Sequence, residues 1–149
     1  MGGAALYRIV YLSRATRTFS DAEMSDLAAR SGAWNSAVGV TGLLLYDGSR
    51  FLQALEGPEA AAKATMDRIA DDKRHDSLAY IQDDPVRDRQ FGTWAMQFKL
   101  APAGCCSTDF LERVKEDVTL VDDLHLRAAF IGFAVLSSQR PRGYACSNR

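Results

Sequence analysis

The sequence predicts an α+β fold in which an antiparallel-rich sheet carries two helices on one face. Three observations lead to this prediction. Strand-like stretches alternate with two helical patterns, an Asp47-Gly48 pair suits the turn of a β-hairpin, and a capping box opens the first helix. The resulting order, β-α-β-β-α-β, is that of the ferredoxin-like sandwich, here with an additional strand and a C-terminal helical extension.

The chain begins with a strand and a helix. Residues 6–13, LYRIVYLS, are rich in β-branched and aromatic side chains and predict the strand. Ser20 and Glu23 have the spacing of a capping box, so the helix begins there and runs to about Asn35. At helical spacing its inward stripe consists of Met24, Leu27, Ala28, Ser31 and Asn35. The last two are polar side chains on an otherwise apolar stripe.

A hairpin, a second helix and two further strands follow. The Asp47-Gly48 turn joins two antiparallel strands, and Gly57-Pro58 ends the second of them and starts a helix. The predicted elements are strands at 40–46 and 50–56, a helix from Glu59 to about Asp72, a strand at 77–82, a polar loop at 83–90 and a strand at 91–100.

After these strands the composition changes. Two helices are expected at residues 107–117 and 122–138, and we place them on the face of the sheet that the first two helices leave open. The sequence thus predicts a sandwich domain at residues 5–101, a helical extension packed on its sheet at 102–140 and a disordered tail at 141–149.

Composition and charge exclude several classes of protein. The formal net charge of −1 gives no global field that would attract nucleic acid or an anionic membrane. The longest apolar run, residues 128–136, is too short to cross a bilayer. The cysteines Cys105, Cys106 and Cys146 show neither a disulfide framework nor a zinc spacing. We therefore expect a small cytoplasmic protein without metal.

A candidate binding site is indicated by Gln53, which lies between Phe51 and Leu55 on the inward face of a predicted strand. A buried amide without partners costs about 1–3 kcal/mol, so a partner is expected. Tyr11, Ser31 and Asn35 lie on neighbouring elements of the predicted fold. An apolar slot with a few convergent polar groups is typical of a flat-ligand site. Its expected apolar walls are Leu27, Leu44, Phe51 and Ile69, with Arg74 and His75 at the mouth.

Each of these residues alone also has an ordinary structural explanation. A tyrosine on a strand usually packs in a core, an asparagine near a helix end usually caps it, and DKRH at residues 72–75 suits a solvated helix terminus. The pattern by itself predicts a pocket but names no ligand.

Longer motifs carry a resemblance. The stretches IVYLSRAT, SGAWNSAVGVTGLLLYDGSRFLQALEGP, IADDKRH and RQFGTWAMQF occur in this order between about Leu6 and Leu100. In order and spacing they resemble the BLUF domain, the blue-light sensor module that uses FAD, of the short single-domain type. The resemblance implies a ferredoxin-like fold that holds the flavin ring between its two helices.

The resemblance also implies roles for single residues. Tyr11 corresponds to the tyrosine that gives an electron and a proton to the excited flavin, and Gln53 to the glutamine that bridges this tyrosine to the flavin. Asn35 corresponds to the asparagine that hydrogen-bonds the flavin's polar edge. The other matches are Ser31 near the ring; Leu27, Leu44, Phe51 and Ile69 at its apolar contacts; Asp72, Arg74 and His75 near the ribityl and phosphate part; and Trp94 and Met96 as the light-responsive pair on the last strand.

The function expected from the resemblance is that of a blue-light photoreceptor, not an enzyme. Light would rearrange the hydrogen bonds among Tyr11, Gln53 and oxidised FAD. The signal would then pass to a separate effector protein of unknown identity. A homodimer or higher oligomer is also expected. Trp34 departs from the family at a variable position beside the ring, where it would stack on the flavin, compete with Tyr11 as electron donor or simply cover the site.

The competing class is a flavin-free ferredoxin-like protein, either a small regulatory module or an acylphosphatase-like enzyme. The enzyme would need an arginine in a glycine-rich loop after the first strand. Arg14 and Arg17 lie there, but SRATRT contains no glycine.

Overall fold

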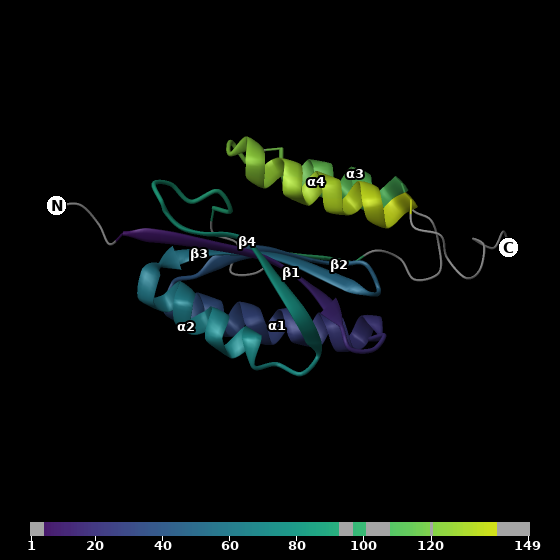
Figure 1. Cartoon of the computed structure of the whole chain (residues 1–149), viewed down its shortest axis with the longest axis horizontal. Coiled ribbons are helices and arrows are strands. Elements are labelled where there is room, and N and C mark those ends of the chain that lie inside the picture. Colours follow the sequence, from purple (N-terminus) through teal and green to yellow (C-terminus); the bar gives the residue numbers. More distant parts are fainter. Residues whose placement is uncertain (1–4, 93–96, 101–107, 120, 140–149) are drawn as a thin grey trace, which may run out of the picture.

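The computed structural model describes residues 5–92, 97–100, 108–119 and 121–139 (Figure 1). Its elements are β1 (Leu6–Ala15), α1 (Asp21–Val38), β2 (Thr41–Tyr46), β3 (Arg50–Pro58), α2 (Glu59–Ala70), β4 (His75–Val86), β5 (Gln97–Leu100), α3 (Thr108–Asp117) and α4 (Leu124–Gln139). The strands form a five-stranded sheet in the order β4-β1-β3-β2-β5. The predicted α+β, ferredoxin-like architecture is confirmed.

Strand pairing places the candidate site at the centre of the sheet. β1 is antiparallel to both β3 and β4, and the register sets Tyr11 directly opposite Gln53. β2 is antiparallel to β3 and parallel to β5. Gly42 on β2 lies so close to β3 that an added Cβ would stand 2.1 Å from the carbonyl oxygen of Ala54. A side chain at this position would push the two strands apart.

Both faces of the sheet are covered, as the alternation along β3 requires. Figure 1 shows α1 and α2 on one face and α3 and α4 on the other. Phe51 and Leu55 belong to apolar clusters on the α1–α2 face, whereas Leu52 and Ala54 belong to the cluster that includes residues of α3 and α4. That cluster joins Val10, Leu43, Leu45, Leu52 and Ala54 of the sheet to Phe110, Val114, Leu126, Phe130, Phe133 and Ala134 of the helices.

The ends of α1 follow from local chemistry. The capping box is confirmed, because the Ser20 hydroxyl accepts from the Glu23 N–H at 3.1 Å while the Glu23 carboxylate accepts from the Ser20 N–H at 2.8 Å. The helix continues past the expected end, to Val38, and stops at Gly39, whose φ of 79° lies in the left-handed region that glycine tolerates. The extra turn keeps Asn35 inside the helix.

The prediction of a polar loop at residues 83–90 is wrong for residues 83–86, which belong to β4. β4 runs on to Val86, and Tyr7 lies opposite Pro85 in the ladder with β1. β4 is an edge strand, where a proline that lacks an N–H breaks no necessary hydrogen bond. The last strand, expected at 91–100, is observed at Gln97–Leu100, whereas Phe91 and Gly92 lie in a turn, so its predicted start at 91 is wrong. Trp94 and Met96 lie outside the described residues.

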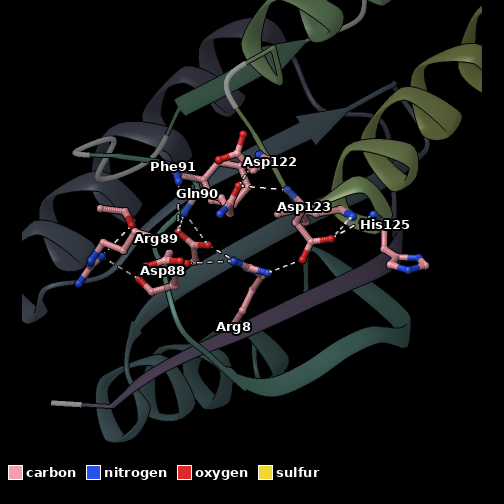
Figure 2. Close-up of polar contacts among 11 residues, drawn as sticks. Arg8, Asp88, Arg89, Gln90, Phe91, Asp122, Asp123 and His125 are labelled. Carbon is pink, nitrogen blue, oxygen red and sulfur yellow. Dashed lines mark hydrogen bonds and ion pairs between the residues drawn. The ribbon is translucent and has the colours of Figure 1, made fainter. Parts of the chain in front are cut away.

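A buried polar network that the sequence analysis did not identify ties the sheet to α4 (Figure 2). The Glu56 carboxylate, which is 0% exposed, accepts from Arg8 Nε at 2.8 Å and from the backbone N–H of Gln90 at 2.8 Å. Arg8 Nη1 also donates to Asp123 at 3.0 Å, and Gln90 Oε1 accepts from the N–H of Asp122 at 2.6 Å. Asp123 in turn accepts from the N–H groups that begin α4.

Candidate flavin site

A pocket of about 220 Å³ lies between α1, α2 and the sheet. Every residue expected to bind a cofactor lines it: Tyr11, Leu27, Ser31, Asn35, Leu44, Phe51, Gln53, Ile69, Asp72, Arg74 and His75. Arg30, Trp34, Thr65 and Arg68 complete the lining. The structure therefore brings together side chains from β1, α1, β2, β3, α2 and the start of β4.

Tyr11 and Gln53 form the polar centre of this pocket. Both are only 3% exposed, and the Tyr11 hydroxyl donates a hydrogen bond to Oε1 of Gln53. Burial raises the pKa of Tyr11 well above its usual value, and the negative charge of Asp72 raises it further. The phenol thus keeps its proton, and the amide oxygen of Gln53 is oriented toward it.

The α1 wall contributes the second amide. Asn35 is 1% exposed although it is polar, and its position on the same helix face as Leu27 and Ser31 follows from helical spacing. The backbone carbonyl of Asn35 accepts from Val40 N at 2.9 Å, which fixes the end of the helix beside the pocket. Asn35 and Gln53 place two buried amides, each with donor and acceptor atoms, on the lining of one small cavity.

His75 lines the pocket but uses both ring nitrogens within the protein. Nε2 donates to the carbonyl oxygen of Ile69 at 2.6 Å, because a carbonyl can only accept, and Nδ1 bonds the Ser13 hydroxyl at 2.7 Å. The ring stands edge-on to Tyr11, with centroids 5.8 Å apart, and to Phe51 at 6.0 Å. His75 therefore presents ring carbons to the pocket and holds the start of β4 against the end of α2.

Asp72 and Arg74 form a close ion pair at the mouth, 2.7 Å between Nη2 and Oδ2. Burial by itself would raise the pKa of Asp72, but the hydrogen bonds from the side chain and backbone of Arg74 outweigh it and lower this pKa below the usual range. Asp72 is therefore ionised, and the charge of Arg74 is compensated.

Sequence reasoning missed Arg30, Thr65 and Arg68 and left the place of Trp34 open. The indole N–H of Trp34 donates to Thr65 Oγ1 at 3.0 Å, which connects α1 to α2. The signal for the α2 residues was available, because Thr65, Arg68, Ile69 and Asp72 follow one another at helical spacing. Arg14 and Arg17, the candidates for an acylphosphatase-like site, pair instead with Asp76 and Glu23 and do not line the pocket.

Two buried amides among apolar walls form a lining typical of an α+β module that binds a small, flat ligand with one polar edge. Residues 6–97 match the family model of BLUF, described as sensors of blue-light using FAD. The chain belongs to the BLUF family. A flavin is the cofactor of this family, and the two buried amides, the apolar walls and the arginines at the mouth suit its polar edge, its ring and its charged tail.

Individual relatives agree with this assignment. The blue light- and temperature-regulated antirepressor BluF of Escherichia coli is 39% identical over 75 residues, which cover 50% of this chain and 18% of the antirepressor. The photoactivated adenylate cyclase subunit beta of Euglena longa is 31% identical over 90 residues, 60% of this chain and 10% of the cyclase. The solved dark-state structure of BlrB, a BLUF protein, is 26% identical with a TM-score of 0.67, covering 91% of this chain and 98% of BlrB.

These matches differ in how much of each relative the chain covers. The chain spans only about a tenth of the cyclase, whereas it corresponds to nearly all of BlrB. The shared part is the region that matches the family model of blue-light sensors using FAD. No helix within the described ranges has the length and apolarity needed to cross a membrane, and those ranges contain no His, Cys, Asp and Glu cluster suited to a metal ion.

Proposed function

We propose that the protein is a blue-light photoreceptor that binds oxidised FAD in the pocket between α1, α2 and the sheet. It switches by rearranging the hydrogen bond between Tyr11 and Gln53 and passes the signal to a separate partner protein. The observation that carries the proposal is this hydrogen bond, which joins two buried polar side chains on the lining of the same pocket.

Different lining residues hold different parts of the cofactor. Asn35 and Gln53 bind the polar edge of the ring, with Ser31 beside them, and the apolar walls are Leu27, Leu44, Phe51 and Ile69. Asp72, Arg74 and His75 lie toward the ribityl end. When bound, an oxidised flavin absorbs blue light and in its excited state withdraws an electron and a proton from a nearby phenol.

Tyr11 supplies that phenol, and its own chemistry suits the role. Its raised pKa keeps the proton on Oη until light is absorbed, and the hydrogen bond to Oε1 holds the Gln53 amide in one orientation. While Tyr11 lacks this proton the hydrogen bond would be broken and the amide free to turn; the electron and proton would then return to Tyr11, so that the flavin would end oxidised. An amide has a donor at one end and an acceptor at the other, so turning exchanges the group that Gln53 offers to the pocket.

The route out of the site runs through the sheet to its other face. Gln53 faces the pocket while its neighbours Leu52 and Ala54 pack in the cluster that contains Phe130 of α4. We assign residues 5–101 to the sensor domain, 102–140 to a helical extension that relays the signal and 141–149 to a tail. Trp94 and Met96, which belong to the sensor domain, are the proposed light-responsive pair.

The partner is a downstream effector protein, and α4 offers a surface for it or for a second copy. Leu124 and Leu136 on this helix are 70% and 56% exposed despite their apolar side chains. The family likeness supports FAD as the cofactor, because the family description names it. Neither nucleic acid nor a membrane is part of the proposal.

The first experiment is the visible absorption spectrum of the purified protein in the dark and directly after blue light. We expect an oxidised flavin band that moves slightly to the red and returns in the dark. Gln53→Leu should bind flavin and lose the shift, because a leucine has no donor or acceptor to exchange. Gln82→Leu is the matched control, since Gln82 lies on β4 away from the pocket lining, and should keep the shift.

Other outcomes contradict the proposal in distinct ways. A band that bleaches under blue light means photoreduction in place of the switch, with Trp34 as the first donor to replace. A colourless protein that takes up no FAD removes the receptor function altogether and returns the chain to a flavin-free module.

A further inference from the structure

The two helices over the second face of the sheet differ in their outward residues (Figure 1). Every described position of α3 that is exposed carries a charge: Glu112, Arg113, Lys115 and Glu116. α4, by contrast, contains no Asp, Glu or Lys, and the guanidinium of Arg127, its single arginine, donates to the backbone carbonyl of Val121. Because a solvated helix face is normally charged or polar, the outward face of α4 has the character of a covered surface.

The outward face of α4 carries large apolar residues at its two ends and small residues between them. Leu124 and Leu136 are 70% and 56% exposed, and Ala128 is exposed as well. At Gly132 an added Cβ would meet none of the described atoms within 4 Å. These four residues follow one another four positions apart, so they lie along one side of the helix.

This pattern is the same when it is read from either end of α4. Its order is large, small, small, large, and its midpoint falls at the level of Phe130. In an antiparallel pair of α4 helices with a two-fold axis at that level, Ala128 of each copy lies level with Gly132 of the other, and Leu124 lies level with Leu136. The small residues let the two backbones approach, and the surface is complementary to itself, as a two-fold interface requires.

The charges at the helix ends also favour the antiparallel arrangement. It sets the positive end of each helix dipole beside the negative end of the other. The last turn of α4 contains no basic residue, and its last carbonyl groups have no partner within the helix. His125, which is exposed in the first turn, lies next to that last turn in the second copy and has a ring N–H to donate to it.

We propose that α4 is the contact between two copies of this chain, packed antiparallel about a two-fold axis level with Phe130. The size of the contact determines its strength. A helix of 16 residues is about 24 Å long and about 10 Å wide, so it offers a strip of about 240 Å². This is well below the roughly 800 Å² per partner of a standard interface, so the dimer is reversible, with a dissociation constant on the order of 10–100 µM. The inference goes beyond the proposed function and does not depend on a flavin.

The test is sedimentation velocity of the purified protein in the dark, at concentrations from well below to well above that dissociation constant. We expect a monomer at the low end and a dimer at the high end. Gly132→Lys should weaken the dimer by about tenfold or more, because it places bulk and like charge at the seam. The same change should raise the Tm of the monomer by about 1–3 °C, because lysine favours a helix more than glycine does. A merely structural role for Gly132 would not move the two properties in opposite directions.

A matched pair of surface variants controls for general stickiness. Leu136→Gln removes an exposed apolar side chain from the proposed contact and should weaken the dimer by about tenfold, since each dimer loses it twice. Ile81→Gln removes a side chain of similar size and exposure, 53%, from β4 and should leave the dissociation constant unchanged. This pair also answers the question if Gly132→Lys disturbs the fold.

Cross-linking tests the direction of the helices. We would mix Leu124→Cys with Leu136→Cys at a concentration above the dissociation constant and add a short bismaleimide. The mixture should give a linked dimer, whereas Leu124→Cys alone should give little, because its two copies lie about 18 Å apart along the helix axes. The native cysteines are replaced by serine in both variants: Cys105, Cys106 and Cys146.

Each contrary outcome has its own meaning. A protein that stays monomeric at every concentration overturns the inference and leaves the face of α4 to the effector protein. A dimer that persists in a folded Gly132→Lys variant, or that Ile81→Gln weakens as much as Leu136→Gln does, overturns it because another surface then makes the contact. Efficient cross-linking of Leu124→Cys with itself overturns the antiparallel packing. None of these results bears on flavin binding, so the receptor function stands or falls separately.

Discussion

At the scale of single residues, the surroundings of Tyr11 change the pKa of its phenol. Burial raises its pKa and the nearby charge of Asp72 adds to the effect. For a phenol, a raised folded-state pKa means that the neutral form is favoured in the native protein. The folded state is therefore undisturbed below the pKa of about 10 of a free tyrosine and loses stability as the pH rises beyond it.

This gives a pH prediction for the phenol. Of the five tyrosines, Tyr11 should not ionise before the protein unfolds, so Tyr11→Phe should leave unchanged the number that titrate reversibly up to about pH 11. The measurement is ultraviolet difference absorbance of phenolate, with far-ultraviolet circular dichroism as the check that the fold persists. One fewer titrating tyrosine in the variant would show that Tyr11 is accessible to water and not held by Gln53.

At the scale of elements, the network around Glu56 decides how α4 meets the sheet. Arg8 is 2% exposed and connects Glu56 of β3 with Asp123, the residue before α4, and Figure 2 shows Arg8 reaching toward Asp123. Gln90 connects the same two segments: its backbone N–H donates to Glu56, and its side-chain oxygen accepts from the backbone N–H of Asp122. Charges buried in this way require partners, so the segment at Gln90 and the start of α4 are held in one arrangement.

Removing the shared carboxylate tests this arrangement. Glu56→Ala leaves Arg8 buried without that partner and should lower the free energy of unfolding by about 3–5 kcal/mol. Glu59→Ala, which breaks an exposed pair with Lys63, should cost no more than about 1 kcal/mol. Chemical denaturation measures both. Hydrogen exchange should show lost protection at the first turn of α4 in the Glu56 variant alone, and equal effects of the two changes would mean that the network does not hold α4.

At the scale of the whole molecule, a single sheet serves two apolar layers. β3 sends Phe51 and Leu55 toward α1 and α2 and Leu52 toward α3 and α4. Phe130 of α4 is 0% exposed in the second layer and makes an edge contact with Phe91. Because the layers share the same strands, loss of either one exposes apolar surface on the sheet that supports the other.

We therefore expect the chain to unfold as one unit. Phe130→Ala should lower the free energy of unfolding by about 3–5 kcal/mol. Release of the flavin, followed by its fluorescence, should coincide with the loss of circular dichroism in both the wild-type protein and the variant. Two separate transitions in the variant, with flavin retained after part of the helical signal is lost, would show that α3 and α4 form an independent layer.

Much of the fold and of the pocket was predictable because local spacing carries it. The capping box located the start of α1, the Asp47-Gly48 turn located the hairpin, and alternation along β3 placed Gln53 on the pocket face. The assignment of Tyr11 and Asn35 to the same cavity followed from the order of elements. Arg68 was missed because an arginine in a helix is usually solvated, although its spacing from Ile69 and Asp72 places it on the pocket face.

The sequence by itself determined the order of strands and helices, the apolar faces of each and the pocket residues that lie on those faces. Only the tertiary structure decided that β4 continues through Pro85, that Arg68 rests on Trp34, and that Arg8 and Glu56 are joined to Asp123. The reason is physical: hydrophobic period and capping act between residues a few positions apart. Strand pairing at an edge, an aromatic stack between two helices and a buried charge network depend on partners that folding brings together from distant parts of the chain.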